Sequence, residues 1–221
     1  MSEHNQKSTN AKIAHPKRKI SHLGIAILTL IVLLFVVTTI IYAMTPSNTI
    51  FNWFIRLFGL YGFIFLVIAS IMSSFLVEIN KIFGKPFLKL HHIAAALGLS
   101  LITLHPILLA IESNSLLIFL PNFESWFMFW VLAGRPSLII IYLAFFGILF
   151  KKKLKYWRGT HALMYIALLM GYVHGMLIGT DFKNPVLLIL FSILFALTVI
   201  AFVMRRYQLY VKSKQKKNKT A

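Results

Sequence analysis

Apolar residues dominate this chain in six long stretches, which short polar segments separate. A helix crosses a hydrocarbon core of about 30 Å with about 20 mostly apolar residues. Each stretch is close to that length, so the pattern predicts an all-α bundle of six transmembrane helices. The predicted spans are Leu23–Met44, Trp53–Ile79, Leu90–Ile111, Trp126–Phe150, Gly159–Gly179 and Pro185–Met204.

The fourth stretch is the least regular, because Arg135 and Pro136 interrupt it. Proline is tolerated in the first turn of a helix. We therefore expect this helix to begin near Pro136, or near Trp126 with a kink. The first stretch is too long for the apolar region of a signal peptide, and no clean cleavage site follows it. It is therefore expected to remain as an anchor.

Composition supports a membrane protein. Apolar residues make up 59% of the 221 residues and charged residues only 13%, whereas soluble domains have about half and a quarter. The net charge of +18 comes from short basic runs between apolar stretches, which is typical of membrane loops. We expect membrane lipid as a partner and no nucleic acid. The absence of cysteine excludes disulfides, iron–sulfur clusters and thioether-linked haem.

The basic residues also predict the orientation. With six spans, 20 of the 23 Lys and Arg residues fall in the two tails, the second–third loop and the fourth–fifth loop. The positive-inside rule then places both termini in the cytoplasm of a cell whose plasma membrane the chain crosses several times. The predicted division is a basic tail at 1–20, a six-helix haem-binding domain at 21–205 and a basic tail at 206–221. Both tails are expected to be disordered or to lie on anionic lipid.

Histidines are the candidate functional residues. Five of the eight lie in only two spans, and ionisable residues within a span are functional candidates by default. His91, His92 and His105 belong to the third span, and His161 and His174 to the fifth.

The spacing of these histidines predicts two layers. His91 and His105 are 14 residues apart and His161 and His174 are 13 apart, which is about 20 Å in each helix. Since both helices run in the same direction, His91 shares a depth with His161, and His105 with His174. Each layer could offer two imidazoles to one haem iron.

Other sites fit this spacing less well. A zinc or copper site needs ligands that converge on one point, and a proton relay would add polar groups at intermediate depths, where this chain is apolar. Small residues such as Gly98 leave room for a flat macrocycle, or let helices pack closely.

A step of 13 residues turns a regular helix by roughly 140° away from its starting face. His161 and His174 therefore need a helix irregularity, which we expect near Gly171, or haems that are offset laterally. His92 and His105 are also 13 residues apart. His91 is preferred as the ligand on geometry, with His92 as its competitor.

At these residues the chain resembles the ferric reductase-like transmembrane family. That family includes ferric reductases, the membrane half of NADPH oxidases and the haem-binding subunit of a periplasmic methionine sulfoxide reductase. The resemblance covers roughly residues 55–205 and lies in HHIAAALGLSLITLHP and WRGTHALMYIALLMGYVHG. It implies two haem b groups with His91, His105, His161 and His174 as axial ligands, and electron transfer from the cytoplasm outward.

One departure from the family concerns the electron donor. Full-length oxidases continue into a flavin and nicotinamide domain, and this sequence shows no Gly-rich dinucleotide fingerprint. A separate flavoprotein carrying FMN or FAD, or a quinol, is therefore the expected donor. Cationic residues near the membrane faces are candidates for binding haem propionates. They are Lys89 and Arg158 for the inner haem and Arg135 for the outer haem.

The expected function is transmembrane electron transfer as an oxidoreductase subunit, with no catalytic residue assigned. One alternative is a membrane anchor that feeds electrons to a periplasmic or surface reductase. Another, of a different class, is a small non-redox transporter or scaffold.

Overall fold

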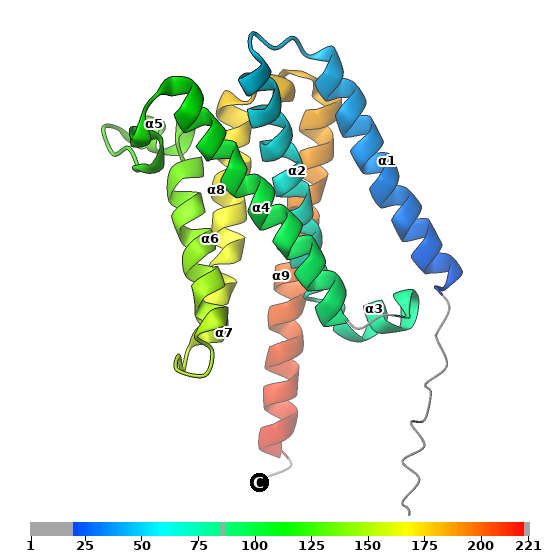
Figure 1. The fold of residues 1–221 in the computed structure, drawn as a ribbon. Coiled ribbons are helices and arrows are strands. Elements are labelled where there is room, and N and C mark those ends of the chain that lie inside the picture. Colours follow the sequence, from blue (N-terminus) through cyan, green and yellow to red (C-terminus); the bar gives the residue numbers. More distant parts are fainter. Residues whose placement is uncertain (1–19, 85–86, 219–221) are drawn as a thin grey trace, which may run out of the picture.

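The computed structural model describes residues 20–84 and 87–218, and its regular elements in these ranges are helices. Figure 1 shows the long helices crossing the molecule between two ends. In chain order the elements are α1 (His22–Met44), α2 (Ile50–Met72), α3 (Leu76–Phe83), α4 (Phe87–Ser113), the 3₁₀ turn η1 (Leu116–Phe119), α5 (Trp126–Val131), α6 (Gly134–Leu149), α7 (Trp157–Ala162), α8 (Met164–Ile178), the 3₁₀ turn η2 (Thr180–Lys183) and α9 (Pro185–Asn218).

Five segments of the described chain are long and apolar enough to cross a membrane. They are α1, α2, α4, the combined segment α7–α8 and α9. The fourth predicted span is instead divided into α5 and α6, because the helix stops after Val131 and restarts at Gly134 with Pro136 in its first turn. The 16 residues of α6 extend only about 24 Å. Five of the six predicted spans therefore coincide with a helical segment that is long and apolar enough to cross a membrane.

The second predicted span, Trp53–Ile79, was too long, because α2 ends at Met72. Ser73 and Ser74 stop the helix by bonding to backbone carbonyls. The Ser73 hydroxyl donates to the Ser70 carbonyl at 2.7 Å, and the Ser74 hydroxyl donates to the Ala201 carbonyl of α9 at 2.5 Å. The chain then turns into the separate short helix α3.

The sixth predicted span, Pro185–Met204, was too short. Helix α9 has 34 residues, or about 51 Å, and so extends beyond a 30 Å hydrocarbon core. Residues 206–218 continue the helix, so the disorder expected for the tail is wrong there, and the alternative that the tail lies on anionic lipid stays a prediction. Lys, Arg and Gln are good helix formers, which explains the continuation. Of the predicted tail at 1–20, residues 1–19 lie outside the described residues.

The basic segments gather at one end of the molecule. In Figure 1, α3, the α6–α7 connection and the C-terminal end of α9 lie at the lower end, which we call the basic side. The α1–α2 and α8–α9 connections lie at the other end, which we call the far side. Helices α4 and α8 both run from the basic side to the far side, as the sequence predicted.

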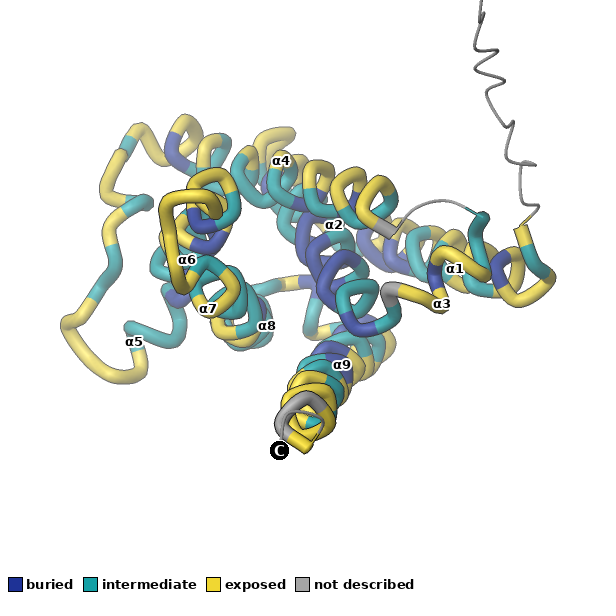
Figure 2. The backbone as a smooth tube through the Cα atoms, turned by 90° about the horizontal axis from the view of Figure 1, so that it is seen from below, coloured by how far each residue is buried: buried dark blue, intermediate teal, exposed yellow. Residues whose placement is uncertain are grey.

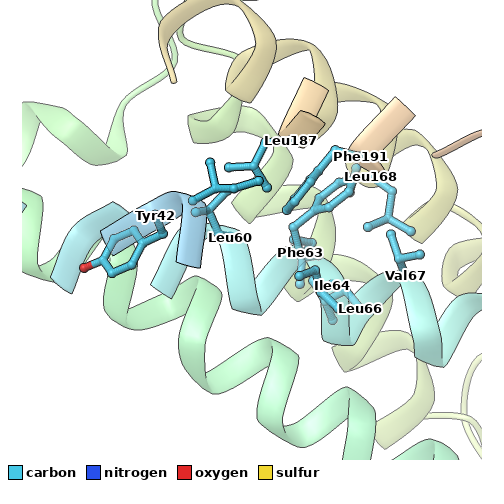
Figure 3. Packing of buried hydrophobic residues seen from close by; sticks show 12 residues of the cluster. Tyr42, Leu60, Phe63, Ile64, Leu66, Val67, Leu168, Leu187 and Phe191 are labelled. Atoms are coloured by element: carbon cyan, nitrogen blue, oxygen red, sulfur yellow. The ribbon is translucent and has the colours of Figure 1, made fainter. Parts of the chain in front are cut away.

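Helix α2 forms the centre of the packed core. Figure 2 shows buried residues concentrated along it, and Figure 3 shows its contacts with α8 and α9. Phe63 stacks on Phe191 of α9 with ring centroids 5.7 Å apart. Ile64, Leu168 of α8 and Leu187 of α9 complete this cluster with 2% exposure or less.

Helices α2 and α4 pack closely through glycine. A Cβ atom at Gly62 would lie 2.8 Å from the Ile102 nitrogen, and a Cβ atom at Gly98 would lie 2.9 Å from Leu66. Such distances leave no room for a side chain. Gly98 therefore serves the packing of α4 on α2 rather than making space for a macrocycle.

Candidate functional site

The basic-side histidines of α4 and α7 lie close together. The ring centroids of His91 and His161 lie 6.4 Å apart with an interplanar angle of 86°. Two imidazoles that bind one metal from opposite sides, each at about 2.0–2.1 Å, have centroids about 6 Å apart. The separation matches that arrangement, although edge-to-face ring packing falls in the same range.

Hydrogen bonds orient three of the four predicted ligands. In each, ring nitrogen Nδ1 lies close to a backbone carbonyl of another element. Since a carbonyl oxygen can only accept, Nδ1 donates and Nε2 carries the lone pair that a metal requires. The bonds are His91 to Ala69 at 3.1 Å, His105 to Ile55 at 2.7 Å and His174 to Val131 at 2.7 Å.

The fourth histidine differs from the other three. Nδ1 of His161 is the one buried side-chain nitrogen or oxygen without a hydrogen-bond partner in the described part of the chain. An unsatisfied buried polar atom costs about 1–3 kcal/mol. The packed helices therefore provide no hydrogen-bond partner for Nδ1 of His161.

The far-side histidines are His105 and His174. A glycine lies against each ring: a Cβ atom at Gly59 would be 3.1 Å from Nδ1 of His105, and one at Gly134 would be 2.8 Å from Nε2 of His174. Both imidazoles are thus held against the backbone of a neighbouring helix.

The helix irregularity expected between His161 and His174 is present, but at another position. The break between α7 and α8 falls at Leu163, whose N–H bonds to the Thr160 carbonyl at 3.1 Å. The prediction that it lies near Gly171 was wrong, because Gly171 is inside the regular helix α8.

His92, the alternative candidate for the basic-side ligand on α4, lies outside the pair formed by His91 and His161. His92 is exposed, with its ring centroid 5.9 Å from that of His91. Only His91 lies against both α2 and His161. The arrangement favours His91 over His92.

The predicted propionate-binding residues occupy three different settings. Lys89 and Arg158 are exposed on the basic side, and the guanidinium of Arg158 lies 5.3 Å from the Trp157 ring centroid. Arg135 donates to the Leu120 carbonyl at 3.0 Å. Arg135 therefore fixes a loop.

No three metal-binding side chains converge within residues 20–84 and 87–218. A site built from protein ligands alone needs about four donors. Axial ligation of a haem needs only one or two, because the macrocycle supplies the others. The histidine pairs are thus suited to a haem more than to a bare metal ion.

Sequence reasoning missed a buried ion pair near the far-side histidines. Arg56 of α2 donates to Asp181 of η2 through Nε at 2.9 Å and through Nη2 at 2.5 Å. Their side chains are only 9% and 4% exposed. Arg56 also donates to the Thr45 and Pro46 carbonyls at 3.2 and 3.1 Å. A single arginine in an apolar span was the available signal.

This ion pair links α2, which contacts His105, to the segment that follows the helix of His174. Arg56 follows Ile55, whose carbonyl accepts from His105. Asp181 lies three residues after the end of α8, the helix that carries His174. We conclude that the pair fixes the α8–α9 connection against α2.

Comparisons with family models, with curated proteins and with solved structures gave no match. The ferric reductase-like resemblance therefore stays a prediction from two histidine motifs.

Proposed function

We propose that this chain is a multi-pass membrane protein that passes electrons between the two sides of the plasma membrane. In this proposal His91 and His161 hold one haem b, and His105 and His174 hold a second. The observation that carries it is the closeness of His91 and His161, whose ring centroids are 6.4 Å apart. By the positive-inside rule, the basic side and both termini face the cytoplasm.

The donor chemistry fits two haems. Neutral imidazoles that donate from Nδ1 to a carbonyl present Nε2 as the ligand atom, and three of the four histidines have that carbonyl. A haem supplies one-electron redox chemistry at its iron.

The chain itself would supply the apolar separation between the two haems and the cationic residues that bind their propionates. The two histidine layers are about 20 Å apart along α4, with apolar helix between them that excludes water. Arg135 at the far pair, and Lys89 and Arg158 at the basic side, are suited to bind anionic propionates. A flavoprotein or a quinol delivers the electrons, and the acceptor is a small oxidant or a reductase on the far side.

Histidine substitutions test the ligand assignment. We expect His105→Ala and His91→Ala each to lose one of two haems, measured by the absorption of the purified, dithionite-reduced protein. His92→Ala is the matched control and should keep both. Retention of both haems in His91→Ala and His105→Ala would reject the assignment.

Transfer across the membrane needs its own assay. Vesicles that contain the protein and trapped ferricyanide should consume the ferricyanide when dithionite is added outside, and His105→Ala vesicles should not. A haem-free protein with no transfer would instead favour a non-redox transporter or scaffold. Transfer that occurs only with a bound far-side protein would favour an electron-feeding subunit.

A further inference from the structure

A groove of about 360 Å³ lies between α7–α8 and α9 on the basic side. One wall carries Gly159, Leu163 and Leu169, and the other carries Phe195, Phe202 and Arg206. Apart from Arg206, these residues are apolar or glycine. The groove lies outside both histidine pairs, so it needs a separate explanation.

The groove has the length of one lipid leaflet. Gly159 to Leu169 and Phe195 to Arg206 each extend about 15 Å along their helices. That is half of a hydrocarbon core of about 30 Å. Gly159 and Arg206 lie towards the basic ends of their walls, because α7 begins and α9 leaves the bundle there. The groove therefore runs from the basic-side membrane face to about the middle of the bilayer.

At its charged end lies Arg206, whose cation has no carboxylate partner in the part of the chain that the structure describes. The guanidinium of Arg206 lies 5.1 Å from the Phe202 ring centroid, and the Phe202 ring packs on Tyr165 at 4.6 Å. Within the described residues, no carboxylate lies within 4.0 Å of Arg206. The chain has only five acidic residues, and none of those in the described ranges forms an ion pair with Arg206.

We propose that this groove binds an anionic phospholipid of the basic-side leaflet. One acyl chain lies between α8 and α9, against Leu163, Leu169 and Phe195, and the phosphate pairs with Arg206. Arginine binds phosphate through two parallel hydrogen bonds, and basic pockets between transmembrane helices are suited to anionic headgroups. The proposal does not depend on haem binding, so either can fail without the other.

Two arginines next to each other in sequence give a matched test. The full chain in detergent is mixed with equal amounts of phosphatidylglycerol and phosphatidylcholine of the same acyl chains, and retained lipids are counted by native mass spectrometry. We expect about fivefold preference for phosphatidylglycerol, from one basic contact. Arg206→Gln should abolish the preference, and Arg205→Gln, which changes the same charge outside the groove wall, should keep it.

A second pair of variants tests the acyl chain. Ile166 lines the groove and is 49% exposed, while Ile193 is 52% exposed and does not line it. Ile166→Trp should fill the groove and reduce retention of both lipids, and Ile193→Trp should not. Equal retention of the two lipids by the unmodified protein, equal losses in the two arginine variants, or unchanged retention in Ile166→Trp would overturn the proposal.

Discussion

The two histidine pairs are carried by the same two spans, yet the protein holds them differently. On the far side, both Nδ1 atoms have carbonyl partners at 2.7 Å, a glycine lies against each ring, and a buried ion pair holds the α8–α9 connection against α2. On the basic side, His91 has a longer bond of 3.1 Å and Nδ1 of His161 has none. The far pair is thus fixed by the helices, whereas the basic-side pair depends more on its ligand.

The largest effect should come from breaking the buried ion pair. Asp181→Asn leaves Arg56 buried without its counter-charge, which costs about 3–5 kcal/mol. We expect a lower unfolding temperature in detergent and loss of the far-side haem before the basic-side haem. Glu112→Gln is the control, because Glu112 contacts only the exposed Thr49 hydroxyl among the hydrogen bonds of the described residues. Equal stability of the two variants would show that the ion pair does not hold the far side.

Filling a glycine next to one ring should have an intermediate effect. In Gly134→Ala the new methyl group would lie 2.8 Å from His174, and such overpacking costs about 1–3 kcal/mol. We expect a shifted or missing far-side haem signal and an unchanged basic-side signal in reduced absorption spectra.

Gly159→Ala is the matched glycine control, because a Cβ atom there meets nothing within 4 Å. Its stability should stay within about 0.5 kcal/mol of the parent. If both glycine variants kept the far-side haem unchanged, close backbone contact would not be what positions His174.

The smallest effect should be a difference in the rate of haem release between the two pairs of the unmodified protein. Transfer of haem to an excess of an apo-haem protein should empty the basic-side pair first, because His161 lacks one hydrogen bond. One such bond is worth about 0.5–1.5 kcal/mol, so the two rates should differ by about 2- to 10-fold. Faster haem release from the far-side pair would contradict the conclusion that this pair is held more firmly by the helices.

Hydropathy alone predicted most of the helices, because lipid requires long apolar segments whatever their detailed sequence. One error lies where local polar contacts end a helix, because Ser73 and Ser74 shorten the second span. The contact of Ser74 cannot be read from an apolar pattern, since its partner is 127 positions away. The break before Gly134 in the fourth span, by contrast, lies where Arg135 and Pro136 interrupt that pattern.

The four histidines were identifiable from the sequence, but the backbone carbonyls that accept hydrogen bonds from three of them were not. Every residue has a carbonyl, so nothing in the sequence marks Ala69, Ile55 or Val131 as hydrogen-bond acceptors. Arg56 was visible as a charge within an apolar span, but its partner Asp181 is 125 residues away. Only the fold brings these groups together.

The most direct measurement is the number of haems per chain in the purified full-length protein. Protein mass and extracted haem are quantified on the same sample, with oxidised and dithionite-reduced spectra recorded beforehand. Two histidine pairs predict two haem b groups per chain. A colourless protein, or one that binds a single haem after saturation, would contradict the account.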